Sequence, residues 1–201
     1  MTGFPAHVDR PNGYWTFVAQ LLRNPRQVSA LAPSSQRLGR MMARQLPVSA
    51  ARVAEFGAGL GNITAEILNV GIAPDELFAF ELNPVFARHL RTALPAVRVV
   101  NAPAQEMDTC IPGKVDAVVS GLPLLSMPAG MQHDIVAAAF RGLRPDGVYI
   151  QFTYGPFPPL QQAVAQALGL AFTRTVRVWG NVPPATVYVY RRCRSQVSRP
   201  A

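Results

Sequence analysis

Apolar and polar residues follow a repeating pattern through most of this chain. From position 52 onward, short and mostly apolar runs alternate with longer stretches in which apolar residues recur at helical spacing. The short runs predict strands and the longer stretches predict helices. The predicted strands are 52–56, 77–81, 97–101, 115–120 and 148–153, and the predicted helices are 62–70, 84–93, 131–143 and 160–168. Repeated strand–helix units favour an α/β fold with a doubly wound, mostly parallel sheet.

The pattern changes towards its end. Residues 144–147 (Arg-Pro-Asp-Gly) predict a turn before the fifth strand. Two further apolar runs, 172–178 and 186–190, have no helical stretch between them. We therefore expect the sheet to finish with an antiparallel pair of strands.

Two helices are expected before the first strand. Residues 14–22 carry apolar side chains at the spacing of an amphipathic helix, and the chain is aromatic there at Tyr14 and Trp15. A second helix is expected from Ser34 or Ser35, either of which can cap it, to about Gln45.

Length and composition favour a single domain. The chain has 201 residues, of which 49% are hydrophobic, which suits one well-buried α/β domain. We expect residues 1–50 to form a helical extension of a main domain at 51–201, the two making effectively one domain. The apolar runs are too short for a membrane-spanning helix, and the start has no signal-peptide pattern. Cys110 and Cys193 lack ligand spacing, so we expect reduced thiols, a cytoplasmic location and no metal.

Positive charge is concentrated at the two ends of the chain. The formal net charge is +8; residues 1–50 contain only one acid, Asp9, and residues 171–201 contain none, although both segments are rich in arginine. This distribution suggests an anionic partner, for which nucleic acid and an anionic membrane both qualify. Basic ends kept only for solubility remain an alternative.

A glycine-rich turn follows the first predicted strand. Glu55, Gly57, Gly59 and Gly61 give the spacing ExGxGxG. Turns that bind nicotinamide or flavin dinucleotides require a third small residue at the next position, which here is Asn62. The spacing therefore favours a nucleoside ligand that needs close approach to the backbone and has no pyrophosphate.

A second acid, Glu81, ends the next predicted strand, about 20 residues beyond the glycines. A carboxylate at this place in a Rossmann-like sheet accepts both hydroxyl groups of a ribose. A packing turn with an unrelated surface glutamate is the alternative.

Together these residues resemble the class I S-adenosylmethionine-dependent methyltransferases over residues 52–190. The resemblance implies a Rossmann-like sheet of seven strands with the last inserted antiparallel beside the sixth, and S-adenosyl-L-methionine as cofactor, leaving as S-adenosyl-L-homocysteine. Pro103 stands where many of these enzymes have an aspartate that meets adenine, so Asn101 is a further candidate for that contact. The cofactor contacts implied are Ser34, Ser35, Glu55, Gly57, Gly59, Gly61, Glu81, Leu82, Ala104, Gln105 and Ser120.

The exit of the fourth predicted strand bears on the methyl acceptor. Methyltransferases acting on adenine place a side-chain amide and an aromatic residue there, whereas residues 120–124 read SGLPL. Segments 22–26, 32–36, 148–156 and 178–185 resemble the bacterial phospholipid N-methyltransferases. That resemblance implies N-methylation of phosphatidylethanolamine and its mono- and dimethyl products toward phosphatidylcholine, by an enzyme peripherally bound to the inner face of the cell membrane, with no nucleic-acid partner.

Roles for individual residues follow from this interpretation. The ammonium of the lipid must lose a proton, and Tyr14, Tyr154, or water relayed by Ser120 and the Leu122 carbonyl are candidates to take it. Trp15 could hold a methylated cation through its ring. Arg177, or Arg174, is a candidate for the lipid phosphate, whereas His133 is expected to be an ordinary surface or core histidine.

Two other functions stay open at this point. One is an rRNA adenine-N-methyltransferase, favoured by the basic ends, and the other is a membrane-binding domain without activity. The pattern does not determine the number of methyl transfers, the preferred lipid or the oligomeric state.

Overall fold

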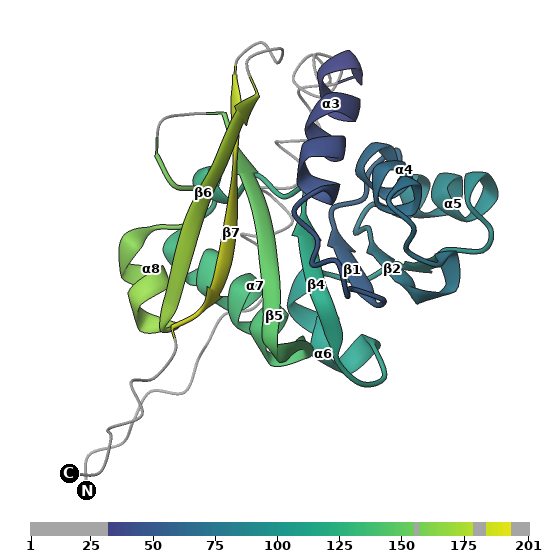
Figure 1. Cartoon of the computed structure of the whole chain (residues 1–201). Coiled ribbons are helices and arrows are strands. Elements are labelled where there is room, and N and C mark those ends of the chain that lie inside the picture. Colours follow the sequence, from purple (N-terminus) through teal and green to yellow (C-terminus); the bar gives the residue numbers. More distant parts are fainter. Residues whose placement is uncertain (1–31, 155–156, 179–183, 194–201) are drawn as a thin grey trace, which may run out of the picture.

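A computed structural model describes residues 32–154, 157–178 and 184–193. Within these ranges the protein forms one seven-stranded sheet in the order β3-β2-β1-β4-β5-β7-β6, shown in Figure 1. Strands β1 to β5 are parallel to one another, and β7 runs antiparallel to both β5 and β6. The strands are β1 Val53–Phe56, β2 Leu77–Phe80, β3 Arg98–Val100, β4 Val115–Ser120, β5 Leu143–Thr153, β6 Leu170–Val178 and β7 Ala185–Arg192. The expected fold, including its antiparallel ending, is confirmed.

Helices cover both faces of the sheet (Figure 1). One face is covered by α3 Ala32–Ala43, α4 Asn62–Asn69 and α5 Pro84–Ala93, and the other by α6 Met107–Cys110, α7 Ala129–Gly142 and α8 Gln162–Ala167. Three short 3₁₀ helices complete the description: η1 Pro74–Glu76, η2 Ala104–Glu106 and η3 Leu124–Ser126. In the described ranges, no helix is long and apolar enough to cross a membrane.

The apolar strand runs are explained by burial on both faces. Every residue of β1 and β2 is buried, as is all of β4 except the half-buried Asp116. Alternate side chains enter opposite cores: Ala54 and Phe56 pack towards α7, whereas Val53 packs towards α3 and α4. A central parallel strand therefore has no face in solvent, and apolar residues predominate along it, although polar residues such as Glu55 and Ser120 are buried there too.

The start of α3 differs from expectation. Helix α3 begins at Ala32, so Ser34 and Ser35 lie in its first turn and neither is its cap. Pro33 explains the earlier start, because the first helical turn needs no backbone N–H at that position and proline already has a helical φ. The expected helix at 14–22 lies outside the described residues, and the division at residue 50 stays a prediction.

The expected turn at 144–147 lies inside β5. Leu143 pairs with Val115 and Val148 pairs with Ala117, so the residues between them bulge out of an otherwise paired strand. The turn-forming residues account for the bulge, because Arg144, Pro145 and Asp146 are exposed and make no demand on the core.

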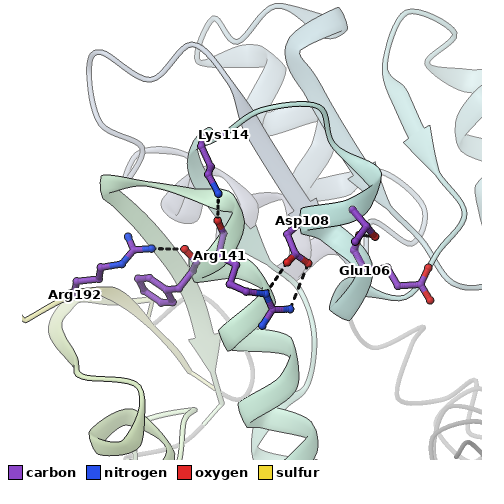
Figure 2. A network of polar contacts seen from close by, with 7 residues as sticks. Glu106, Asp108, Lys114, Arg141 and Arg192 are labelled. Carbon is purple, nitrogen blue, oxygen red and sulfur yellow. Dashed lines mark hydrogen bonds and ion pairs between the residues drawn. The ribbon is translucent and has the colours of Figure 1, made fainter.

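The last carbonyls of α7 are capped by cations from other elements (Figure 2). Lys114 donates to the Arg141 carbonyl, and Arg192 at the end of β7 donates to the Phe140 carbonyl with its guanidinium 5.2 Å from the Phe140 ring centre. The Arg141 side chain in turn holds Asp108, with Nε 2.6 Å from Oδ2. Terminal carbonyls of a helix lack partners in the helix, so these cations fasten α7 to the edge of the sheet where β4 and β5 begin.

Candidate functional site

The glycine turn after β1 is bent so that its backbone faces open space. Gly57, Gly59 and Gly61 have φ values of +71°, +57° and +88°, which side chains rarely allow. The amides of Gly57 and Ala58 both donate to the Phe80 carbonyl, at 2.9 and 3.1 Å, which fixes the turn against the end of β2. Among the described residues, a Cβ on Gly59 would meet only the Gly57 carbonyl oxygen, at 4.0 Å. The turn therefore leaves room for a ligand beside its backbone.

Glu81 joins the end of β2 to this turn. Its Oε2 accepts a hydrogen bond from the Gly59 amide at 2.8 Å, and its Oε1 accepts one from the Asn83 amide at 2.7 Å. Each carboxylate oxygen keeps a second lone pair, so the group can still accept two ribose hydroxyls. A carboxylate here also repels phosphate, which agrees with the expectation of a nucleoside ligand.

Asn101, directly after β3, is hydrogen-bonded to the backbone at the end of β2. Its amide nitrogen donates to the carbonyls of Glu81 and Leu82, at 2.7 and 3.1 Å. Its Nδ2 thus holds the backbone beside Glu81, which leaves Oδ1 for the base contact considered from the sequence, and that contact stays a prediction. No spacing rule would have revealed a contact between the ends of two strands.

Glu55 lies beneath the turn and is fully buried on the α3 and α4 side of the sheet. Thr64 in the first turn of α4 donates its hydroxyl to Oε2 at 2.6 Å, while Oε1 has no partner among the described residues. Burial raises the pKa of Glu55 to about 8, and the charge of Glu81 adds to the effect. The side chain is therefore mainly neutral at pH 7.

The segment after β3 borders the position expected for a base. Ala104, the first residue of η2, is buried, and the Gln105 side-chain oxygen is buried without a partner in the part of the chain that is described. Pro103 has extended geometry and leads the chain into η2. Ala104 and Gln105 follow β3, the neighbour of β2 in the sheet, and their contact with an adenine stays a prediction.

The exit of β4 lies directly against the glycine turn. The Gly121 amide donates to the Phe56 carbonyl at 2.8 Å. The Leu122 side chain covers Gly57, where an added Cβ would come within 2.8 Å of Leu122 Cδ2. The loop after β4 is thus one wall of the same site.

The Leu122 carbonyl is already fully hydrogen-bonded. Its oxygen accepts the Leu124 amide at 2.9 Å and the Gln151 side-chain amide at 2.7 Å. A carbonyl oxygen has two lone pairs, so the expected role of this carbonyl in taking the substrate's proton is not supported. Pattern reasoning missed Gln151 because its contact crosses from β5 to the β4 exit.

The other described candidates for proton acceptor, Ser120 and Tyr154, lie on opposite faces of the sheet. Ser120 is fully buried and faces the α7 side, and the Leu122 amide lies 3.4 Å from its hydroxyl. Tyr154 packs towards the α3 side, with its ring centre 5.2 Å from that of Phe152. Its hydroxyl is buried with no partner among the described residues, and burial raises the pKa of this phenol. Tyr154 therefore stays protonated at neutral pH.

Several expected residues lie outside what the structure describes or away from the site. Tyr14, Trp15 and the side chains of Ser34, Ser35 and Arg177 fall outside the described part; the Arg177 backbone pairs with Thr186 in β6 and β7. His133 is exposed on α7, as expected of a surface histidine, with Nδ1 3.4 Å from Asp134 Oδ1. Within the described ranges, no group of side chains is suited to a metal ion.

The residues at the site fit S-adenosylmethionine. An open glycine cradle, a carboxylate aimed at the ribose position and buried polar atoms on Glu55 and Gln105 supply the partners that a nucleoside with a methionine tail needs. The groups come from β1, β2 and β3, whose carboxyl ends lie side by side.

Comparison with solved structures supports the fold. The chain is similar to 1,6-didemethyltoxoflavin-N1-methyltransferase of Burkholderia thailandensis, with a TM-score of 0.70, 18% identity, and 94% of this chain and 93% of that chain covered. It is also similar to a TehB-like methyltransferase from Corynebacterium glutamicum, with a TM-score of 0.63, 16% identity, and coverage of 87% and 99%. At these identities the likeness shows the fold alone.

Comparison of sequences goes further. No family model matches the chain. The ornithine lipid N-methyltransferase of Singulisphaera acidiphila is 32% identical over 153 residues, which cover 72% of this chain and 79% of the relative. The chain therefore belongs to the class I S-adenosylmethionine-dependent methyltransferases, in the family that contains this lipid N-methyltransferase.

Proposed function

We propose that this methyltransferase N-methylates the amine of a phospholipid headgroup, phosphatidylethanolamine and its mono- and dimethyl products, toward phosphatidylcholine. The observation that carries the proposal is the apolar wall at the acceptor side. Leu122 covers Gly57 where a base-modifying enzyme would offer a side-chain amide and a stacking ring. Such a wall gives a flipped adenine little to hold, and it suits a small aliphatic amine.

A lipid acceptor also accords with exposed apolar side chains at the same edge. Leu60, Leu125 and Phe157 are 56%, 50% and 71% exposed. They follow β1, β4 and β5, which are neighbours in the sheet, so the three loops share the edge that bears the site. Apolar side chains around the entrance favour contact with the membrane interface. The arginine-rich ends would add attraction to anionic lipid at the inner face of the cell membrane.

The main task of the protein in methyl transfer would be to orient the acceptor amine and the cofactor relative to each other. When bound, S-adenosylmethionine supplies a methyl group on a sulfonium for attack by an amine lone pair. Glu81 would hold the ribose through its two oxygens, and the backbone at Gly57 and Gly59 would border the methionine part. Leu122 would exclude water beside the reacting amine, which keeps the approach in line.

Tyr154 is proposed to bind the substrate amine and not to take its proton. The lipid ammonium must lose a proton before it attacks, and the raised pKa of Tyr154 keeps this phenol from acting as the base at neutral pH. Its hydroxyl oxygen, which has no partner among the described residues, would instead accept a hydrogen bond from the neutral amine. Tyr14 and Trp15 are proposed to contact the methylated headgroup, and Arg177 its phosphate.

Labelled cofactor offered with defined acceptors tests the function. Vesicles of phosphatidylethanolamine, monomethyl phosphatidylethanolamine or ornithine lipid are compared with phosphatidylcholine vesicles and with rRNA. The ornithine lipid arm is included because the relative in Singulisphaera acidiphila methylates that lipid. We expect label in phosphatidylethanolamine; label only in ornithine lipid would correct the acceptor, and label only in RNA would overturn the proposal.

Contact with the membrane is tested separately. Phe157→Ser is expected to weaken sedimentation with anionic vesicles several-fold, because burying a phenylalanine side chain contributes about 2 kcal/mol when complete. Val48→Ser serves as the matched control, since Val48 is also exposed but precedes β1 at the other edge. Equal sedimentation of the two variants would argue against the edge with Phe157 as the contact surface.

A further inference from the structure

Gln151 is a fully buried amide in β5 whose hydrogen-bonding groups are all used. Its Nε2 donates to the Leu122 carbonyl at 2.7 Å and to the Phe152 carbonyl at 3.1 Å. Its Oε1 accepts the hydroxyl of Tyr149 at 3.1 Å. A buried polar group with every partner in place holds one geometry, since any movement would leave a donor or acceptor unpaired.

The contact with Leu122 fixes a tight turn. Pro123 has φ −81° and ψ +66°, and the Leu124 amide donates to the Leu122 carbonyl at 2.9 Å. These values define an inverse γ-turn, for which the ring of proline already supplies φ. A three-residue turn has only one hydrogen bond of its own, and Gln151 provides the second bond to its carbonyl.

The turn sets the width of the site. The same residue, Leu122, presents its carbonyl to Gln151 and its side chain to Gly57. A shift of the carbonyl away from β5 would therefore move the apolar wall relative to the glycine turn. Displacements of about 1 Å at a reacting centre can cost a factor of about 100 in rate.

We propose that Gln151 is a positioning residue for methyl transfer, which holds the Leu122 turn at a fixed distance from the glycine turn and so aligns the acceptor amine. The inference rests on the proposed function only in taking the β4 exit as the acceptor wall. It assigns no contact between Gln151 and substrate or cofactor. The residue acts through Leu122.

The test is the isosteric change Gln151→Glu. When ionised, the introduced carboxylate has no donor for the Leu122 carbonyl and repels it; when protonated, it can donate one hydrogen bond there. Tyr149, whose pKa burial raises, stays neutral and remains a donor. We expect kcat to fall at least about tenfold at pH 8.5. The ratio of variant to native kcat should rise as pH is lowered, and the acceptor KM should change less than kcat.

Gln132→Glu is the matched control. Gln132 is equally buried on α7, and its Nε2 donates to the carbonyls of Leu124 and Met127 in the same loop, at 2.8 and 3.1 Å. It holds the loop beyond the turn and, among the described residues, makes no hydrogen bond to Leu122. A merely structural role for both amides predicts the same loss of melting temperature and the same kinetic change.

Cofactor affinity, measured by calorimetry at the same pH values, is the second readout. We expect Gln151→Glu to keep the dissociation constant of S-adenosylhomocysteine within about threefold, because no cofactor contact is assigned to Gln151. A pH-independent kcat ratio, or equal kinetic loss in the Gln132→Glu control, would overturn the inference. If the native enzyme methylates no lipid, the proposed function has failed, and the kcat ratio is then measured on the acceptor that is methylated.

Discussion

Replacing Glu55 with glutamine should stabilise the cofactor-free protein at neutral pH, and the gain should grow as pH rises. Glutamine has the shape of the protonated acid and can still accept the hydroxyl of Thr64, which lies 2.6 Å from Oε2 in the native chain. Its amide carries two N–H donors in place of one O–H, but it has no proton to lose in this pH range. The pKa of Glu55 rises from 4.5 to about 8 on folding, mainly through burial. Between these values the folded protein keeps a proton that the unfolded chain has released.

The sign and size of the change in stability follow from this difference in bound protons. The native chain has its full stability below pH 4.5 and loses about 1.4 kcal/mol for each pH unit up to about 8. By pH 7 the loss is about 3 kcal/mol, a large part of the stability of an ordinary domain. The glutamine variant does not share this loss, and titrating groups that do not interact with Glu55 affect both proteins equally.

Urea unfolding of both proteins, followed by circular dichroism at pH 5.5, 6.5 and 7.5, measures the effect. The difference in free energy of unfolding should change by about 3 kcal/mol across this range. A difference that stays constant with pH would refute a neutral, buried Glu55.

Three further changes probe the site and the fold. Glu81→Ala should abolish measurable binding of S-adenosylhomocysteine by calorimetry, because both carboxylate oxygens are lost; unaltered affinity would remove Glu81 from the cofactor site. Gly57→Ala should cost more cofactor affinity than Gly71→Ala: both glycines have positive φ, but only the first places the new Cβ against another side chain, at 2.8 Å. Asp108→Asn should lower stability at pH 7 by less than about 1 kcal/mol, because the Arg141 side chain in this ion pair is largely exposed. Arg141 lowers the pKa of Asp108, so this stabilisation is present above the carboxyl's unfolded pKa and is lost as pH falls through its folded one; thermal melts at pH 7 and pH 3 that show an equal difference would contradict it.

The sheet could be predicted because the burial of each strand is reflected in the types of its own residues. A strand such as β4, buried on both faces, is mainly apolar, and the glycine turn favours glycine where φ is positive. The position of Glu81 beside the turn was predictable for a similar reason, because its distance from the turn follows from the length of one helix and one strand. These features depend on residues close together in the sequence.

The features that the sequence did not reveal depend on distant partners. Asn101 binds the carbonyls at the end of β2, and Gln151 binds a carbonyl 29 residues away, so no local pattern marks either residue. The Leu122 carbonyl was predicted to help take the substrate's proton for the same reason: its second hydrogen-bond donor comes from β5, and the local sequence does not show that contact. A turn sequence at 144–147 likewise cannot indicate that pairing of β5 with β4 resumes on both sides of it.

The central pairing of β1 with β4 has a consequence for pieces of this chain. Val53 pairs with Ala117 and Phe56 with Ser120, so the two walls of the site are contributed by segments some sixty residues apart. A fragment that ends at Gly113 carries the whole glycine motif and Glu81 but lacks the Leu122 wall and Gln151, whose amide holds that wall. The motif alone is therefore not a methyltransferase, and mixing residues 1–113 with 114–201 would show whether the site is restored by complementation.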